Sequence, residues 1–415
     1  MNTASYNSDI PLGSMLPLTG PSTVDGIEFR KGIILACEDI NRRGGILGRR
    51  LRPIFVDTGR QNAEEVVAAA AQLIQDHGVH AIINGYNIGP QNSEYEVIAD
   101  AGVIYIHHNT LLQHHDTVLS NPDRYFGCFM ANPAEYWYGQ GFVKFLSWLR
   151  ETGQWAPDNN RIAIISGSKP YSIVIANAMA SAAERFGWSV SFGPKILSTP
   201  RSDWRGVIAE AQATEPAVIA NTHFYATDLA SFQKQFVQRP SNSLVYLQYG
   251  AMHKAFMDIA QESAVGVIVS AVTGLLRDEA GESFSQRYLM RFGQASTPQV
   301  GCQCYNAVHH YAIAASVAGG TGEPGNDAQN RKVAQALIEV PFRSVAGMVR
   351  YHPQWQAAIP YPDQVQDPSL GMPHLFYQVQ DRAVGLALIA PAPYNADRFV
   401  LPAWFSPRYT KAPGW

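Results

Sequence analysis

The order of apolar and polar positions near the amino terminus predicts strands that alternate with helices. Residues 10–16 are apolar and precede the turn Pro17–Pro21, which indicates a strand. Residues 26–41 carry apolar side chains at helical spacing, and the Arg-Arg-Gly-Gly that follows is typical of a helix end. The same reasoning predicts strands over 51–57, 81–84 and 103–106, and helices over 63–77 and 92–101. Continuously apolar strands in this order indicate a parallel sheet covered by helices on both faces.

The rhythm restarts after Pro133 and predicts a second α/β unit. Its predicted helices are 134–149, 172–186, 203–213 and 228–236, and its predicted strands are 161–166, 188–192, 217–220 and 244–247. Further on, the pattern predicts a strand at 265–272, helices at 282–292, 302–318 and 327–338, and short strands at 347–351 and 375–380. The tail 390–415 has no helical period. We expect it to lie extended on the body, because its aromatic side chains would be costly to leave in water.

Length and composition bound the class of protein. The chain has 415 residues, more than the roughly 250–300 at which one hydrophobic core stops growing, so two domains are expected. With 46% apolar and 16% charged residues it should fold rather than remain disordered. The net charge of -3 and the lack of a Lys/Arg block argue against a nucleic-acid partner. The longest apolar runs are far shorter than the ~18 residues that span a bilayer.

The amino terminus and the cysteines leave two questions open. Residues 1–9 contain neither the basic nor the apolar region of a secretory signal. Either the signal is missing from this sequence, or the protein is cytosolic. Cys302 and Cys304 are two apart, unlike zinc ligands, and Cys37 falls on the apolar face of a predicted helix. The cysteines therefore predict no metal site.

Several phrases, in their order and spacing, resemble the type I periplasmic binding proteins of the leucine/isoleucine/valine class. They are Pro-Leu-Thr-Gly-Pro at 17–21, Gly-Gly-Ile-Leu-Gly-Arg-Arg-Leu at 44–51, Asp-His-Gly-Val-His-Ala-Ile-Ile-Asn at 76–84, Asn-Arg-Ile-Ala-Ile-Ile at 160–165 and the helix at 305–314. The resemblance covers most of the chain. Two further stretches, 306–311 and 390–394, look closer to the urea- and amide-binding branch.

The resemblance implies an α/β fold of two Rossmann-like lobes with parallel sheets, joined by a hinge that the chain crosses three times. We expect the crossings near 130–133, 250–253 and 345–348. One lobe would then consist of residues 1–131 and 252–345, and the other of residues 132–251 and 346–415.

The resemblance also implies a function. It predicts the substrate-binding component of an ABC importer of the branched-chain amino acid type, a periplasmic protein that traps a small polar solute in the cleft between the lobes. The ligand would favour the closed form through contacts made only there. Permease subunits in the membrane would be the partners, and neither a cofactor nor a catalytic step is expected. The alternative is a cytosolic amide-sensing receptor that regulates an amidase operon, and a signal sequence upstream would decide against it.

The candidate ligand residues follow the carboxyl ends of strands, where open parallel sheets bind their ligands. In the first lobe this rule and the resemblance together select Tyr86, Asn87, Ile88 and Gly89 after one strand, and Asn109 and Thr110 after the next. In the second lobe they select Tyr171, Phe224 and Tyr249. Tyr171 aligns with a tyrosine that covers the ligand in the family. The family usually has a serine at Ile88, so one hydroxyl donor is lost there.

The charge of the second-lobe candidates bears on the ligand. Amino acid binders of the family often have an acidic residue near Tyr249 for the ligand's ammonium, but the stretch 246–250 reads Tyr-Leu-Gln-Tyr-Gly. A buried ammonium without a counter-charge is expensive. Unless Asp25, Glu94 or Asp228 reaches the ligand, an amide, a urea or a carboxylate fits better than an amino acid.

An enzyme is the least favoured class. Its only support is the adjacent histidine pairs at 107/108, 114/115 and 309/310. Adjacent residues on a strand point to opposite faces, so such pairs do not readily bind one metal. The sequence has no H-E-x-x-H, G-x-S-x-G or P-loop motif. We therefore predict no catalytic residues.

Overall fold

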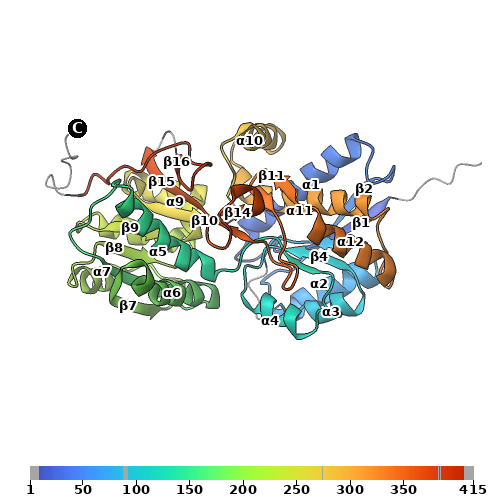
Figure 1. The fold of residues 1–415 in the computed structure, drawn as a ribbon, viewed down its shortest axis with the longest axis horizontal. Coiled ribbons are helices and arrows are strands. Elements are labelled where there is room, and N and C mark those ends of the chain that lie inside the picture. Colours follow the sequence, from blue (N-terminus) through green and yellow to red (C-terminus); the bar gives the residue numbers. More distant parts are fainter. Residues whose placement is uncertain (1–8, 87–91, 273, 382, 384, 406–415) are drawn as a thin grey trace, which may run out of the picture. The chain divides into compact units, whose positions relative to one another are not determined.

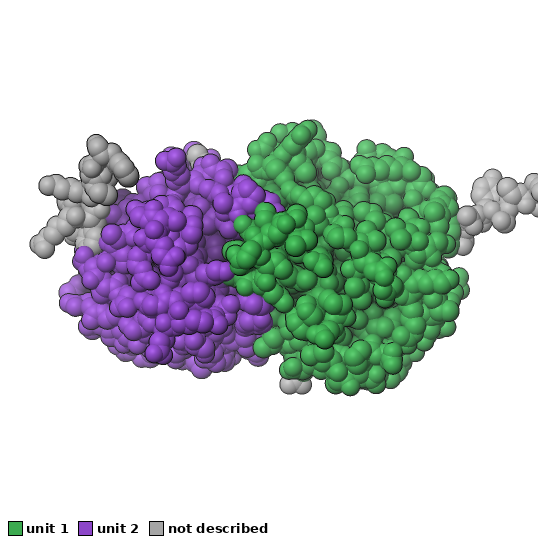
Figure 2. Space-filling model, in the orientation of Figure 1, with its two compact units in different colours: residues 1–134, 273–373 green, residues 135–272, 374–415 purple. Residues whose placement is uncertain are grey.

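The chain divides into two compact units. The computed structural model describes residues 9–86, 92–272, 274–381, 383 and 385–405. Unit 1 consists of residues 1–134 and 273–373, and unit 2 of residues 135–272 and 374–415 (Figure 2). The chain therefore passes from one unit to the other three times.

The units differ from the expected lobes at all three crossings, and at the first of them residues 132–134 belong to unit 1. Residues 252–272 belong to unit 2, because Ile268 pairs with Tyr246 in the sheet of that unit. Residues 346–373 belong to unit 1, where Ala357 forms a parallel bridge with Met130.

Unit 1 is built on a parallel sheet with the order β2-β1-β3-β4-β5 (Figure 1). Its strands are β1 (Ile10–Leu16), β2 (Leu51–Asp57), β3 (Ala81–Ile83), β4 (Ile104–His107) and β5 (Cys128–Met130). Its helices are α1 (Thr23–Arg42), α2 (Ala63–Gln75), α3 (Tyr95–Asp100), α4 (Gln113–Ser120), α10 (Glu279–Phe292), α11 (Pro298–Val317) and α12 (Asp327–Glu339). The short pairs β11 (Phe342–Ser344) with β12 (Gly347–Val349) and β13 (Pro360–Tyr361) with β14 (Met372–Pro373) complete it.

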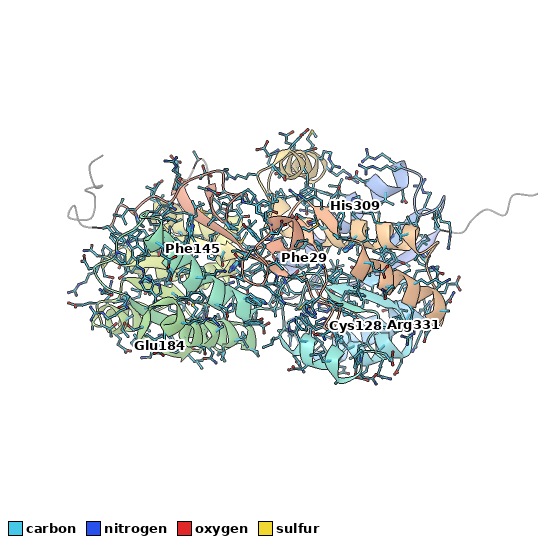
Figure 3. All side chains as sticks on the ribbon, viewed as in Figure 1. Phe29, Cys128, Phe145, Glu184, His309 and Arg331 are labelled. Atoms are coloured by element: carbon cyan, nitrogen blue, oxygen red, sulfur yellow. The ribbon has the colours of Figure 1, made fainter. Side chains whose placement is uncertain are left out.

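Apolar side chains cover both faces of this sheet, as the continuously apolar strands predict. Ile104 and Ile106 of β4 join a core with Phe29 of α1, which is labelled in Figure 3. Tyr105, between them, joins a second core with Leu73 of α2. Successive residues of a strand point to opposite faces, so one apolar run supplies both cores.

The predicted end of the first helix is confirmed. Helix α1 ends at Arg42, and Gly44 and Gly45 follow with φ of 101° and 71°. A side chain at Gly45 would also collide with the backbone, since a Cβ there would lie 1.9 Å from the Arg49 carbonyl oxygen. The turn therefore requires glycine for its conformation and for the close approach of the chain.

Unit 2 is built on a seven-stranded sheet with the order β16-β15-β10-β9-β8-β6-β7. Its strands are β6 (Arg161–Gly167), β7 (Ser189–Leu197), β8 (Val218–Asn221), β9 (Leu244–Leu247), β10 (Ile268–Ala271), β15 (Leu375–Asp381) and β16 (Gly385–Ala390). Its helices are α5 (Tyr136–Glu151), α6 (Pro170–Ala183), α7 (Arg205–Gln212), α8 (Ala226–Phe236) and α9 (Lys254–Ala260), with the 3-10 turn η2 at Tyr249–Met252. Strands β6 to β10 are parallel, whereas β15 and β16 add an antiparallel edge.

Aromatic stacking joins the antiparallel edge of unit 2 to its first helix. Phe145 of α5, labelled in Figure 3, stacks on Phe376 of β15 with ring centroids 4.2 Å apart and an interplanar angle of 4°. The segment after β16 has neither helix nor strand up to residue 405, and Trp404 donates a hydrogen bond to the Ser243 carbonyl at 3.0 Å. The described part of the tail therefore packs on the unit, as its aromatic residues predict, but hydrogen-bonded turns such as that from Phe405 to Pro402 make it irregular rather than extended.

Candidate functional site

In unit 1, the segment after β3 is held by buried contacts. The carbonyl of Asn84 accepts a hydrogen bond from His108 Nδ1 at 2.9 Å, and the Asn84 amide oxygen accepts one from the backbone of Met15 at 3.0 Å. Gly85 has no room for a side chain, because a Cβ would lie 2.1 Å from the Phe29 ring. These contacts fix the backbone that presents Tyr86.

Tyr86 itself is partly exposed and is oriented from three sides. Its hydroxyl donates to the carboxylate of Asp25, its ring lies edge-on to Phe29 at 5.4 Å, and its carbonyl accepts a hydrogen bond from Gln61 at 2.7 Å. The other candidates of this loop, Asn87, Ile88 and Gly89, lie outside the described residues.

The next strand end, after β4, carries Asn109 and Thr110. Asn109 is buried, and its amide nitrogen donates to Asn92 at 3.0 Å and to Glu94 at 3.3 Å. Its backbone nitrogen donates to His107 at 3.1 Å. The hydrogen bonds of Asn109 therefore fix the backbone that presents the next residue, Thr110, which is partly exposed.

Below this edge lies a buried cluster of neutral rings. The Tyr95 hydroxyl lies between His107 Nε2 and His114 Nδ1, 2.6 Å from the latter. Burial lowers the pKa of His107 well below its usual range and that of His114 to about 3. Tyr105 donates to the buried Glu94 carboxylate at 2.7 Å. His107 and His114 are therefore neutral at neutral pH. The cluster supports the backbone at the end of β4.

In unit 2, the structure brings Tyr171, Phe224 and Tyr249 together at the carboxyl ends of β6, β8 and β9. Tyr171 stands on the first turn of α6, and its ring lies edge-on to Phe224 at 5.8 Å. Burial, followed by the neighbouring Tyr138, raises the pKa of Tyr171, and Tyr249 is close enough to contribute to the same shift. Gly250 allows the approach, since a Cβ there would lie 2.1 Å from the Phe224 carbonyl oxygen.

Gln248 is the residue at this edge that the sequence analysis missed. Its side chain is fully buried and donates a hydrogen bond to the Tyr171 hydroxyl at 2.9 Å. It lies two residues after Tyr246, so the alternation of β9 places both side chains on the same face. This alternation could have identified Gln248 from the sequence, because Gln248 lies in the stretch 246–250 that the sequence analysis had already discussed.

The acidic residues near these edges already accept internal hydrogen bonds. Asp25 accepts from Tyr86, and Glu94 accepts from Tyr105 and Asn109. Asp228 of unit 2 accepts from the backbone of Arg201 at 2.7 Å. Each of the three carboxylates that sequence analysis considered for an ammonium group therefore has a structural role.

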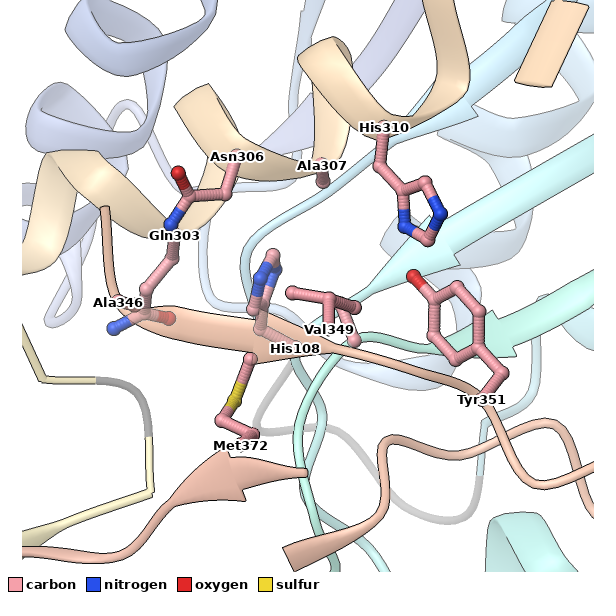
Figure 4. Close-up of a pocket in the computed structure, with 10 residues that line it drawn as sticks. His108, Gln303, Asn306, Ala307, His310, Ala346, Val349, Tyr351 and Met372 are labelled. Carbon is pink, nitrogen blue, oxygen red and sulfur yellow. The ribbon is translucent and has the colours of Figure 1, made fainter. Parts of the chain in front are cut away.

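Two cavities lie elsewhere in unit 1. One of about 10 Å³, roughly the space of one water molecule, is lined by His108, Asn306, His310 and Tyr351 among others (Figure 4). Figure 4 shows the hydroxyl end of Tyr351 turned toward the His310 ring. A larger groove of about 490 Å³ lies beside Ile10, at the amino end of β1. Neither contains Tyr86, Asn109 or Thr110.

In the part of the chain that the structure describes, no three His, Cys, Asp or Glu residues are arranged to hold a metal ion. The described helices include none with the length and apolar composition needed to cross a membrane. All four cysteines are buried thiols.

Comparison with known proteins gives consistent relatives. A family model described as periplasmic binding protein matches residues 9–361. A solved structure from Silicibacter pomeroyi, whose description names a branched-chain amino acid ABC transporter, is 45% identical, covers 95% of this chain and 100% of its own, and superposes with a TM-score of 0.92. The substrate-binding protein LivJ from Streptococcus pneumoniae, solved in complex with isoleucine, is 14% identical over 92% of this chain and 100% of its own with a TM-score of 0.71, which shows a shared fold.

The curated relatives match over a shorter stretch. The Leu/Ile/Val-binding protein homolog 7 of Brucella abortus is 30% identical over 102 residues, which is 25% of this chain and 25% of that protein. The match thus spans about a quarter of the length of these curated relatives.

Proposed function

Because the chain belongs to the periplasmic binding protein family, as its resemblance predicts, we propose that it is the substrate-binding component of an ABC importer of the branched-chain amino acid type. The observation that carries this proposal is the 45% identical structure, which matches 95% of the chain with a TM-score of 0.92. In this role the protein resides in the periplasm, binds a small solute without changing it, and delivers it to permease subunits in the membrane.

The candidate residues of both units support a small polar ligand. Tyr86 and Thr110 stand at the carboxyl edge of the unit 1 sheet, and Tyr171, Phe224 and Tyr249 stand at the corresponding edge of the unit 2 sheet. Aromatic rings offer apolar contact area, and their hydroxyls offer hydrogen bonds that fix orientation. In this proposal Asn109 acts indirectly, by holding Thr110.

The ligand class follows from the charges at these edges. Asp25, Glu94 and Asp228 already accept hydrogen bonds from their own units, so none of them is dedicated to a ligand ammonium. A desolvated ammonium without a dedicated carboxylate costs several kcal/mol. We therefore propose a branched aliphatic amide or carboxylate, rather than the free amino acid, as the preferred ligand.

A series of leucine-shaped compounds tests the proposal. Calorimetry with leucine, 4-methylpentanoate and 4-methylpentanamide varies the ammonium and the carboxylate on one carbon skeleton. The amide and the acid should bind more tightly than leucine, because neither brings an ammonium. Tightest binding of leucine would contradict the ligand class, and no binding of any compound would contradict the branched aliphatic specificity.

Two variants and a control locate the site. Tyr171→Phe and Thr110→Val each remove one hydroxyl with little change of shape, and each should weaken binding of 4-methylpentanamide roughly five-fold. Tyr288→Phe serves as the control, because it removes a buried hydroxyl that bonds Glu28 in the interior of unit 1. Equal loss of affinity in all three variants would mean that the effect arises from stability rather than from contact with the ligand.

A further inference from the structure

Five side chains of unit 2 form an unbroken line of hydrogen bonds that ends at Tyr171. His374 Nε2 lies 3.0 Å from the Ser270 hydroxyl, which lies 2.7 Å from the Tyr246 hydroxyl. Tyr246 bonds the amide oxygen of Gln248, and the amide nitrogen of Gln248 bonds the Tyr171 hydroxyl at 2.9 Å. The first four residues are at most 1% exposed. The line is therefore shielded from water up to its last member.

Gln248 gives this line a direction, because one end of its amide only accepts and the other only donates. Tyr246 donates its proton to the amide oxygen, so its own oxygen must accept from Ser270. Ser270 has then used its proton, and its oxygen must accept from His374. This requires His374 to carry a hydrogen on Nε2.

At the other end, Tyr171 lies beside a second phenol. Tyr138 accepts a hydrogen bond from the backbone nitrogen of Val272 at 3.3 Å, and its ring lies edge-on to that of Tyr171 with ring centroids 6.1 Å apart. Each of the two phenol oxygens thus accepts from a fixed N–H group, that of Val272 or that of Gln248. Because the Tyr171 oxygen accepts from Gln248, its own proton remains for an acceptor outside the line.

Both phenols hold their protons at neutral pH. Burial raises the pKa of Tyr138 to about 12 and that of Tyr171 well above its usual value. A ligand atom at this edge consequently meets a hydrogen-bond donor rather than a phenolate. A charged amine brings only donors, so it could use only the remaining lone pair of the Tyr171 oxygen, which already accepts from Gln248.

We propose that this line of hydrogen bonds fixes Tyr171 as a donor, so that the ligand group at the edge of unit 2 is a carbonyl or carboxylate oxygen. The inference rests on the proposed function. It adds that the ligand's carbonyl or carboxylate oxygen contacts the edge of unit 2. Tyr246, Ser270 and His374 are then positioning residues, because they reach the ligand only through Gln248 and Tyr171.

The direction of the line is tested without any ligand. Two-bond ¹H–¹⁵N correlation spectra of the full chain, with His374→Gln to assign the signal, report which ring nitrogen carries the hydrogen. We expect the Nε2–H form at neutral pH. The Nδ1–H form would overturn the proposal, because Ser270 would then have to donate to His374 and the line would run in the opposite direction.

Calorimetry tests the consequence for the ligand. With wild-type protein, 4-methylpentanamide should bind at least about ten-fold more tightly than 4-methylpentylamine, which has the same skeleton but no acceptor. Tyr246→Phe keeps the ring that stacks on Phe142 at 4.0 Å but frees the Gln248 amide to turn. It should weaken binding of the amide roughly three- to five-fold. In a Tyr171→Phe background the same change should have almost no effect.

The outcomes separate this inference from the proposed function. An equal effect of Tyr246→Phe in both backgrounds would overturn it, because Tyr246 would then act by another route. The control Tyr288→Phe should leave the affinity for the amide unchanged in either background. If wild-type protein binds neither probe, the proposed ligand class is wrong, and the form of His374 still decides whether the line has the proposed direction.

Discussion

Replacing Gly250 by alanine should weaken ligand binding by separating two aromatic residues of unit 2. The added methyl group would lie 2.1 Å from the Phe224 carbonyl oxygen and 2.9 Å from the Ala226 nitrogen. Both are backbone atoms at the start of α8, so no side-chain rotation relieves the collision. Since carbon–oxygen contacts settle at roughly 3.3 Å or more, the backbone must open by about 1 Å.

The size of the effect follows from this displacement. Overpacking of a buried site costs about 1–3 kcal/mol of unfolding free energy. The movement would also carry Tyr249 and Phe224, two candidate ligand residues, apart from one another, which should weaken binding of 4-methylpentanamide roughly ten-fold. Denaturant unfolding measures the first quantity and calorimetry the second.

Gly206→Ala is the matched control. Gly206 lies in the first turn of α7 in the same unit, and a Cβ there meets no atom within 4 Å. Alanine should leave the affinity unchanged and raise stability by a few tenths of a kcal/mol up to about 1 kcal/mol, because it is the better helix former. Wild-type affinity and stability in Gly250→Ala would refute the reasoning, since the turn would then tolerate a contact that the geometry forbids.

Two further predictions concern stability. Burial lowers the pKa of His114 to about 3 and of His310 to about 4 from 6.5, so the unfolded chain binds these protons first. The unfolding free energy should fall as the pH drops from 6.5 toward 4, by up to about 1.4 kcal/mol per pH unit for each histidine. His310→Phe should make this dependence shallower and the exposed His77→Gln should not, whereas identical slopes would contradict the assignment. Phe376→Ala should cost about 3–5 kcal/mol of unfolding free energy, because it empties the stack on Phe145; a loss under 1 kcal/mol by denaturant titration would show that the stack is not a core contact.

The sequence was informative wherever one local pattern sufficed. The run at 10–16 gave β1 with its observed bounds, and the run at 244–247 gave β9. The helix α4 was missed because Gln113–Ser120 carries few apolar residues, and β5 was missed because it has only three residues. The apolar stretch 265–272 was correctly interpreted as a strand, β10, yet assigned to the wrong lobe. Apolarity indicates burial, and nothing in it specifies which sheet a strand joins.

The same limit explains which site residues were found. Tyr171 and Phe224 could be selected because each lies a few residues after a recognisable strand end, and for Tyr171 because the resemblance aligns it with a tyrosine that covers the ligand. The residues that orient Tyr171 come from distant parts of the sequence. Ser270 lies on β10, which the sequence analysis assigned to the other lobe, and His374 is the first residue of unit 2 after the third crossing. Placing them beside Tyr246 requires knowledge of the sheet order β15-β10-β9, which no local pattern encodes.

Because sheet order brings these residues together, buried side chains can determine which ligand the protein prefers. If Tyr171 is a donor because of Gln248, then the chemical identity of the preferred ligand group depends on a buried amide and on the hydroxyls that orient it. Two chains with the same exposed aromatic residues would then differ in preference when they differ at position 248. A glutamate there would accept from both Tyr246 and Tyr171, leaving the Tyr171 oxygen available to a ligand donor. Gln248→Glu should therefore shift preference from 4-methylpentanamide toward 4-methylpentylamine, and it should lose that effect in a Tyr171→Phe background if the phenol, rather than the added charge alone, conveys it.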